Sequence, residues 1–175
     1  MLGDNLTIFF QLSPGCFEKT PLTLGGDMVM QGPFSVAAAD LDGDGDLDLV
    51  SANRDGDDLT VFFQLSAGSF ALDPVRLGDS ATLEGPCSVA AADLDGDGDQ
   101  DLVSANELGR DLTAFFQLSP GSFETAPLRL GSGGAFPASV LATDLDGDGD
   151  QDLILGNQVN VPVARGNLTV FFGGR

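Results

Sequence analysis

The sequence contains no histidine, no tyrosine and no tryptophan, and only two of its 175 residues are cysteine. Because imidazole and thiolate groups are the usual ligands of zinc, copper and iron, sites for these metals are disfavoured. The few serines and lysines have no evident base partner, so no catalytic constellation can be assembled from them. We therefore expect a protein that is not an enzyme.

Long apolar runs and basic residues are also scarce. No run reaches the roughly 18 apolar residues of a membrane-spanning helix, and the start at Met1 has neither the basic residues nor the apolar core of a signal peptide. Seven basic residues stand against 27 acidic ones, which gives a formal net charge of −20. Because no apolar run is long enough, we expect no membrane span. Because the negative charge repels phosphate, we expect no nucleic-acid partner.

One acidic stretch is present in three copies. It reads DLDGDGDLD at residues 40–48 and DLDGDGDQD at residues 93–101 and 144–152. The three copies hold 15 of the 27 acidic residues, while 42% of the whole chain is hydrophobic and can build a core. The acidity is therefore a local property of three loops and not of a solvated tail.

The rest of the chain repeats in register with these loops. Segments that read Leu-Thr-x-Phe-Phe begin at Leu6, Leu59, Leu112 and Leu168, at spacings of 53, 53 and 56 residues. A Gly-x-Phe turn and a Pro-x-x-Leu-Gly segment follow each of the first three. A period of this length indicates a repeat protein.

Each repeat is expected to form four short strands. The first consists of small residues, as at 35–39; the acidic loop joins it to the second, as at 48–53; the Leu-Thr-x-Phe-Phe-Gln and Pro-x-x-Leu segments are the third and fourth. Short strands bounded by turn residues, without helical periodicity, predict an all-β fold. Four-stranded antiparallel blades repeated radially form a β-propeller, whereas the repeats of a β-solenoid are usually shorter.

The predicted array is one repeat domain of about three and a quarter units. It comprises a partial blade with third and fourth strands at 1–34, blades at 35–87 and 88–138, and a blade without its fourth strand at 139–175. Closed propellers typically have about four to eight blades. We therefore expect either that self-association with another copy completes the ring or that the chain is part of a larger propeller.

The third strand of each repeat is bulky on both faces. Leu59, Val61 and Phe63 would lie on one face and Phe62 on the other. This pattern suits a sheet that is packed between two neighbouring sheets, so we expect the phenylalanines to form the core between blades.

The spacing within the acidic loops indicates a cation site. Carboxylates occupy positions 1, 3, 5, 7 and 9, and the glycines at positions 4 and 6 supply the backbone freedom to close the loop. In the first loop we expect Asp40, Asp42 and Asp44 to converge, Asp46 to offer its main-chain carbonyl and Asp48 to return at the head of the next strand. An all-oxygen, flexible site suits Ca²⁺ better than Mg²⁺.

We therefore expect about three Ca²⁺ ions, one in each loop. The candidate ligands are Asp40, Asp42, Asp44, Asp46, Asp48, Asp93, Asp95, Asp97, Asp99, Asp101, Asp144, Asp146, Asp148, Asp150 and Asp152. Without a cation, each close pair of carboxylates costs about 1 kcal/mol in water. Because net stability is only about 5–15 kcal/mol, metal binding should be coupled to stability.

The unit that runs from Ser88-Val-Ala-Ala-Ala through its acidic loop to Gly121-Ser-Phe123 resembles the FG-GAP/VCBS repeat family. It is similar to the calcium-binding blades of integrin α-subunit propellers, and the resemblance covers nearly the whole chain. It implies a calcium-loaded propeller, usually extracellular or at the cell surface, in adhesion, carbohydrate-associated or large multidomain proteins. It also implies that the ligands are Asp40, Asp42, Asp44, the carbonyl of Asp46, Asp48 and their equivalents.

Two features lie outside the repeat pattern. Cys16 and Cys87 occupy non-equivalent repeat positions, so we expect both to be free or to form an incidental pair. The segment 157–167 is five residues longer than its copies and is a candidate contact surface, although loop drift explains its length equally well.

Three functions are compatible with these features. The favoured one is a non-catalytic calcium-binding scaffold or binding module that recognises a protein or glycan ligand. The alternatives are the propeller domain of a polysaccharide-acting enzyme and a purely structural, self-assembling repeat unit. The first is favoured because every regular cluster of acids is already assigned to metal.

Overall fold

The computed structural model describes residues 3–131, 134–158 and 166–174, and within these ranges it contains strands and no helix. The strands are β1 (Asn5–Ile8), β2 (Gln11–Ser13), β3 (Cys16–Phe17), β4 (Leu22–Gly25), β5 (Pro33–Ala39), β6 (Asp48–Asn53), β7 (Asp58–Phe62), β8 (Gln64–Ser66), β9 (Ser69–Phe70), β10 (Val75–Leu77), β11 (Pro86–Ala92), β12 (Asp101–Asn106), β13 (Asp111–Phe115), β14 (Gln117–Ser119), β15 (Ser122–Phe123), β16 (Leu128–Gly131), β17 (Phe136–Thr143), β18 (Asp152–Gln158) and β19 (Asn167–Phe171).

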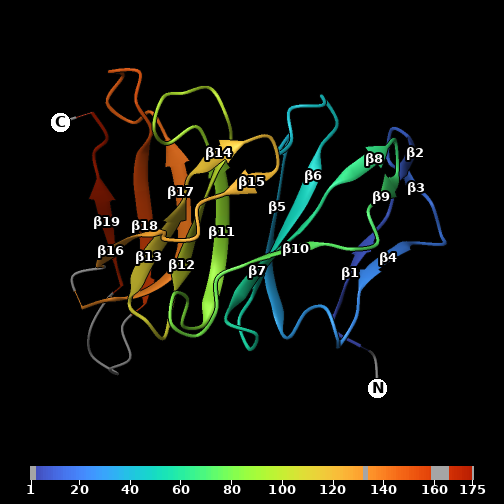
Figure 1. The fold of residues 1–175 in the computed structure, drawn as a ribbon, viewed down its shortest axis with the longest axis horizontal. Helices are drawn as coiled ribbons and strands as arrows, with labels where there is room; N and C mark the ends of the chain where they lie inside the picture. Colours follow the sequence, from blue (N-terminus) through green and yellow to red (C-terminus); the bar gives the residue numbers. More distant parts are fainter. Residues whose placement is uncertain (1–2, 132–133, 159–165, 175) are drawn as a thin grey trace.

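Four antiparallel sheets follow one another along the chain (Figure 1). Their strand orders are β1-β4, β5-β6-β7-β10, β11-β12-β13-β16 and β17-β18-β19. Two-stranded hairpins, β2-β3, β8-β9 and β14-β15, connect the third and fourth strands of the first three sheets. The predicted all-β array is confirmed, and across the described ranges the sheets do not close into a ring.

The first strands of successive sheets lie beside one another, β5 next to β11 and β11 next to β17. A serine marks each junction. The Val89 N–H donates to the Ser35 hydroxyl oxygen at 3.4 Å, and the Val140 N–H donates to the Ser88 hydroxyl oxygen at 3.2 Å. The second, third and fourth sheets are therefore joined in series by the same inner-strand contact.

Apolar side chains of the third strands fill the space between sheets. Leu59 and Val61 pack with Leu102 of the following sheet, whereas Phe62 packs with Leu6 of the preceding sheet. Bulk on both faces of the third strand therefore places each complete sheet between two neighbours, as the sequence predicts.

The third strand is shorter than predicted. Its sheet pairing ends at Phe62, and Gln64 begins the separate β8-β9 hairpin. The physical reason is that the Gln64 N–H donates to a carboxylate oxygen of Asp48 at 2.7 Å, so the chain turns towards that aspartate instead of continuing along the sheet.

In each complete sheet, a buried polar network joins the end of the second strand to the start of the third strand. In the third sheet the Asn106 side chain accepts from Ser104 and donates to Asp111 and Thr113, each at 2.8 Å. Asn53 makes the same three kinds of contact in the second sheet. Because these groups are buried, each bond satisfies an atom that water cannot reach.

The network is incomplete in the last sheet. Leu155 occupies the position of the donor serine, so the Oδ1 atom of Asn157 is buried without a partner among the described residues. The Asn157 amide still donates to Thr169 at 2.9 Å.

Three expectations outside the acidic loops can be compared with the structure. Cys16 and Cys87 are both free, as expected. No helix that could cross a membrane occurs in the described part of the chain. Of the longer segment 157–167, residues 159–165 lie outside the described residues.

The contrast between these asparagines gives a first prediction. We expect Asn106→Ala to lower the free energy of unfolding by about 1–3 kcal/mol more than Asn157→Ala does. The reason is that Asn106→Ala removes the hydrogen-bond partner of three buried polar side chains. Chemical denaturation of the two variants measures the difference. Equal losses would contradict the role of the network.

Candidate metal centres

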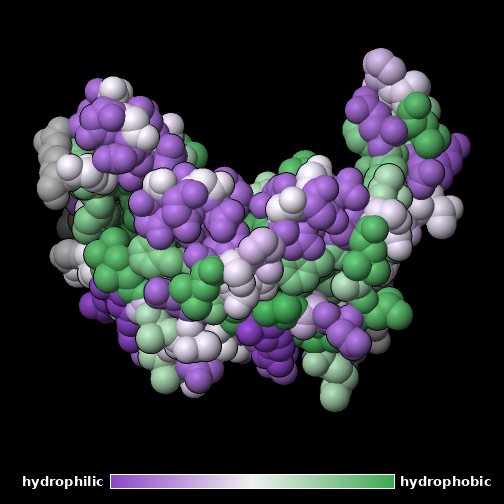
Figure 2. All heavy atoms as spheres, turned by 45° about the horizontal axis from the view of Figure 1, so that its top comes forward, coloured by the Kyte–Doolittle hydropathy of each residue, from purple (hydrophilic) through white to green (hydrophobic). Residues whose placement is uncertain are grey.

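The three acidic loops lie on one rim of the array. They connect β5 to β6, β11 to β12 and β17 to β18, at the top of Figure 1. In the tilted view of Figure 2, hydrophilic residues gather along this rim above a more apolar band. The repeat therefore places three equivalent groups of carboxylates in a row.

Each loop brings three carboxylates together. In the first loop Asp40, Asp42 and Asp48 each present one oxygen, and the three oxygens lie within 4.8 Å of one another. The equivalent groups are Asp93, Asp95 and Asp101, and Asp144, Asp146 and Asp152. Because Ca²⁺–oxygen distances are about 2.3–2.6 Å, ligands on opposite sides of one ion lie about 5 Å apart. The observed spacing therefore fits a single cation in each loop.

The first aspartate of each loop determines the loop's shape. Oδ1 of Asp40 accepts the N–H of Gly43 at 2.8 Å, and Oδ2 accepts the N–H of Gly45 at 3.0 Å. Both glycines have positive φ angles, 76° and 93°, which residues with a side chain rarely adopt. The two glycines therefore let the backbone turn around the Asp40 carboxylate and orient it inward.

The last aspartate of each loop is buried and holds two segments together. Oδ2 of Asp48 accepts the N–H of Leu41 at 2.8 Å, and Oδ1 accepts the N–H of Gln64 at 2.7 Å. Asp101 makes the same two kinds of bond, to Leu94 and Gln117, at 2.8 and 2.7 Å. Asp152 accepts from Leu145 and Gly173, both at 2.9 Å.

Each three-carboxylate group contains the aspartates at positions 1, 3 and 9 of its loop. The aspartates at positions 5 and 7 lie outside the three-carboxylate groups. Instead, Oδ1 of Asp44 accepts the N–H of Asp46 at 2.8 Å. The same contact joins Asp97 to Asp99 at 2.9 Å and Asp148 to Asp150 at 3.1 Å. Their participation in metal binding stays a prediction.

The loop carboxylates are held where negative charge is unfavourable. Burial raises the pKa of the Asp48 carboxyl, its two backbone hydrogen bonds oppose the rise, and the charges of Asp42 and Asp44 add to it. Burial also raises the pKa of Asp42, and it raises that of Asp101. A cation among these groups would remove the repulsion and part of the cost of burial.

The following sheet encloses the first loop. The Gly121 N–H, at the tip of the β14-β15 hairpin, donates to the carbonyl oxygen of Leu41 at 2.9 Å, and Leu41 is fully buried. The equivalent Leu94 is partly exposed and Leu145 is about half-exposed. The first loop is therefore the most enclosed of the three.

The sequence analysis missed a second kind of buried acid. Asp58 lies outside the loops, and its carboxylate forms an ion pair with Arg76 of the fourth strand. The same pair recurs in the next sheet. The sequence did contain a sign of this ion pair. At the positions of Asp58 and Arg76, the first repeat has the uncharged residues Asn5 and Thr23, so the acid and the base are either both present or both absent. Paired with arginine, these acids are not free to bind a metal.

Two substitutions should distinguish an aspartate that supports the loop backbone from one that only binds the cation. In chelator, Asp48→Ala should lower the free energy of unfolding by at least about 2 kcal/mol, because two backbone N–H groups lose their acceptor. Asp42→Ala should have little effect or stabilise, because it removes repulsion. With calcium, both variants should lose stabilisation at this loop. Equal stabilities of the two variants in chelator would contradict the distinction.

The raised pKa values predict the pH dependence of the metal-free protein. A carboxyl with a raised native pKa binds its proton more readily in the folded state than in the unfolded state, where the pKa is about 3.9. Stability in chelator should therefore rise as pH falls from about 7 through the native pKa values towards about 4. With calcium it should fall, because protons compete with the cation. Thermal unfolding across this range measures both slopes, and a falling stability in chelator would contradict the prediction.

A comparison with known families agrees with this architecture. A family model described as an FG-GAP-like repeat matches the chain three times, at residues 3–51, 40–104 and 93–155. Each match includes at least one acidic loop, and together they span most of the chain. No curated protein matches it. The chain belongs to the FG-GAP-like repeat family.

Proposed function

We propose that this protein is a non-catalytic, calcium-binding module of the β-propeller type, with one Ca²⁺ site in each acidic loop. The observation that carries the proposal is the recurrence of the same three-carboxylate group, within 4.8 Å, at the same place in three successive sheets. A solvated acidic turn has no reason to repeat this arrangement with its last carboxylate buried.

The residues that would hold the ion in the first loop are Asp40, Asp42 and Asp48. The side chain of Asp44 and the main-chain carbonyl of Asp46 are further ligands by family resemblance. Oxygen donors of this number and charge suit Ca²⁺, which accepts irregular geometry, better than Mg²⁺. Three ions would change the formal charge of the chain from −20 to −14.

In this proposal the ions support the fold and are not themselves the recognition surface. The loop carboxylates are directed at one another and at backbone N–H groups of their own sheet. A protein or glycan ligand would therefore bind elsewhere on the array. We further propose an extracellular or cell-surface location, where millimolar calcium fills even weak sites.

The test is calcium binding by the whole chain and by a variant with one substitution per loop, D42A/D95A/D146A. Position 3 is chosen because Asp42 accepts one backbone N–H, that of Asp44 at 3.3 Å, whereas Asp40 and Asp48 accept two each. Calorimetry should find about three calcium ions per wild-type chain and none for the triple variant. A filled site at 100 times its Kd adds about 2.7 kcal/mol of stability, so Tm should rise clearly with calcium.

Asp73→Ala is the matched control, because Asp73 is an exposed acid outside the loops. It should respond to calcium as the wild type does. A wild-type Tm that is the same in calcium and in chelator, with no binding heat, would overturn the proposed function.

A further inference from the structure

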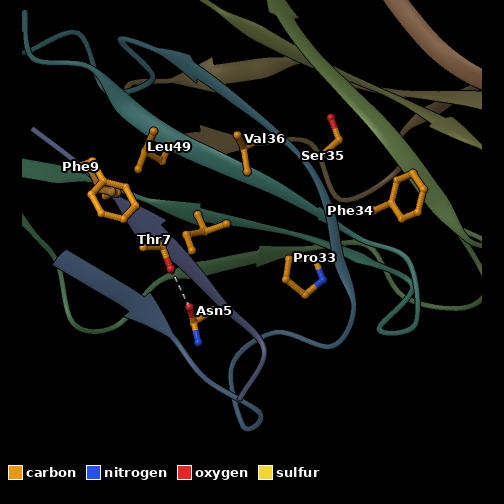
Figure 3. Close-up of a pocket in the computed structure, with 10 residues that line it drawn as sticks. Asn5, Thr7, Phe9, Pro33, Phe34, Ser35, Val36 and Leu49 are labelled. Carbon is orange, nitrogen blue, oxygen red and sulfur yellow. Dashed lines mark hydrogen bonds between the residues drawn. The ribbon is translucent and has the colours of Figure 1, made fainter. Parts of the chain in front are cut away.

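The first sheet has an open edge beside an apolar hollow. Within the described residues β1 pairs only with β4, whereas its equivalents β7 and β13 are paired on both sides. A cavity of about 580 Å³ lies between β1 and the inner strands of the second sheet. Figure 3 shows Thr7 of β1, Phe9 directly after β1, Val36 of β5 and Leu49 of β6 around it.

The hollow exposes a surface that the other sheets bury. Val36 of β5 is 57% exposed, whereas Val89 of β11 and Val140 of β17, at the same repeat position, are 6% and 9% exposed. In the third and fourth sheets this position is covered by the inner strands of the preceding sheet. The surface around Val36 therefore fits the inner strands of another sheet.

The last sheet presents the complementary surface. Leu168 and Val170 of β19 are 72% and 36% exposed, whereas Leu59 and Val61, at the same positions of β7, are fully buried. Leu141 of β17 is 55% exposed on the same side. This is the kind of face that packs against a following sheet inside the array.

The first and last third strands are near copies of each other. Residues 5–10 read NLTIFF and residues 167–172 read NLTVFF, whereas the two internal strands begin with aspartate. Either segment therefore carries the side chains that pair with β18.

We propose that a second copy of this chain fills the hollow with its β17 and β18, and that β1 takes the place of β19 on that β18. The result is a four-stranded blade, β17-β18 from one copy and β1-β4 from the other. The proposal goes beyond calcium binding and depends on none of the loop carboxylates.

The contacts inside the chain define this interface in detail. In the register of β19, Ile8 would lie opposite Ile154, where Val170 lies now. Thr7 would receive the Asn157 amide in place of Thr169. At the inner strands, Ser139 would accept the Val36 N–H, continuing the series of serine contacts between sheets.

Strand β1 is the stronger competitor for β18. It is already paired with β4 along four residue positions, and its Leu6 is only 8% exposed. The corresponding Leu168 of β19 is 72% exposed. Exchange therefore replaces one strand pairing by its equivalent and additionally buries apolar surface around Val36 and Leu141.

Closure needs two copies. Each copy contributes two complete blades, which gives four. Two further blades are shared, each made of β17-β18 from one copy and β1-β4 from the other, so a two-fold dimer contains six four-stranded blades. This number lies within the typical range of about four to eight for closed propellers. Two identical head-to-tail contacts that close on themselves satisfy the rule for finite assemblies.

Sedimentation of the full chain in calcium tests the assembly. The wild type should have twice the 18.0 kDa mass of one chain. Val36→Asp should reduce the mass to that of one chain with an unchanged β-sheet circular dichroism spectrum, because this side chain is exposed in the single chain. Leu72→Asp, at a 93% exposed position away from the interface, should remain a dimer. A wild type with the mass of one chain, or a Val36→Asp variant that remains dimeric, would overturn the proposal.

Engineered cysteines test the strand exchange itself, in a Cys16→Ser background. I8C/I154C should form a disulfide between chains, because directly opposite antiparallel residues lie within disulfide distance. The I154C/V170C variant should not form a disulfide within one chain, because in the exchanged dimer β19 no longer lies beside β18. The reverse result, an internal bond in I154C/V170C and no link in I8C/I154C, would show that β19 stays in place and would overturn the exchange.

Discussion

A single buried carboxylate at the head of each second strand holds the acidic loop and the outer hairpin to the same sheet. Asp48 does this in the second sheet and Asp101 in the third, and Asp152 of the last sheet joins its loop to Gly173 after β19. A carboxylate has about four lone-pair positions, so two backbone bonds leave room for a cation. Because one residue serves both the fold and the candidate site, filling the site necessarily changes the stability of the sheet.

The distribution of charge supports the same view. Outside the loops, the buried acids Asp58 and Asp111 are each paired with an arginine of the fourth strand. Inside the loops, acids face one another and backbone N–H groups, with no basic side chain among the contacts described for Asp48 or Asp101. The uncompensated negative charge of the buried structure is thus concentrated where a cation would be bound.

The features that follow from local pattern were predictable from the sequence. Strand lengths, turn residues and a 53-residue period led to the all-β array, and the bulk around Phe62 led to sheets packed on both sides. The double role of Asp48 was not predictable, because its second partner, Gln64, lies 16 residues away and is brought close only by sheet pairing. The pair Asp58–Arg76 depends in the same way on the register of β7 and β10.

The five aspartates of one loop are alike in sequence but not in the structure. Positions 1 and 9 are fixed by backbone N–H groups and position 3 completes the group, whereas positions 5 and 7 contact each other. Spacing alone could not make this division, because the positive φ angles of the two glycines decide which way each side chain turns.

Anomalous diffraction from crystals grown with calcium is the most direct measurement of whether the repeated carboxylate groups are cation sites. Three peaks are expected, one within bonding distance of each group of three carboxylates, with Asp48, Asp101 and Asp152 still accepting their two backbone N–H bonds. Loops of the same shape with no peak among their carboxylates would contradict the assignment.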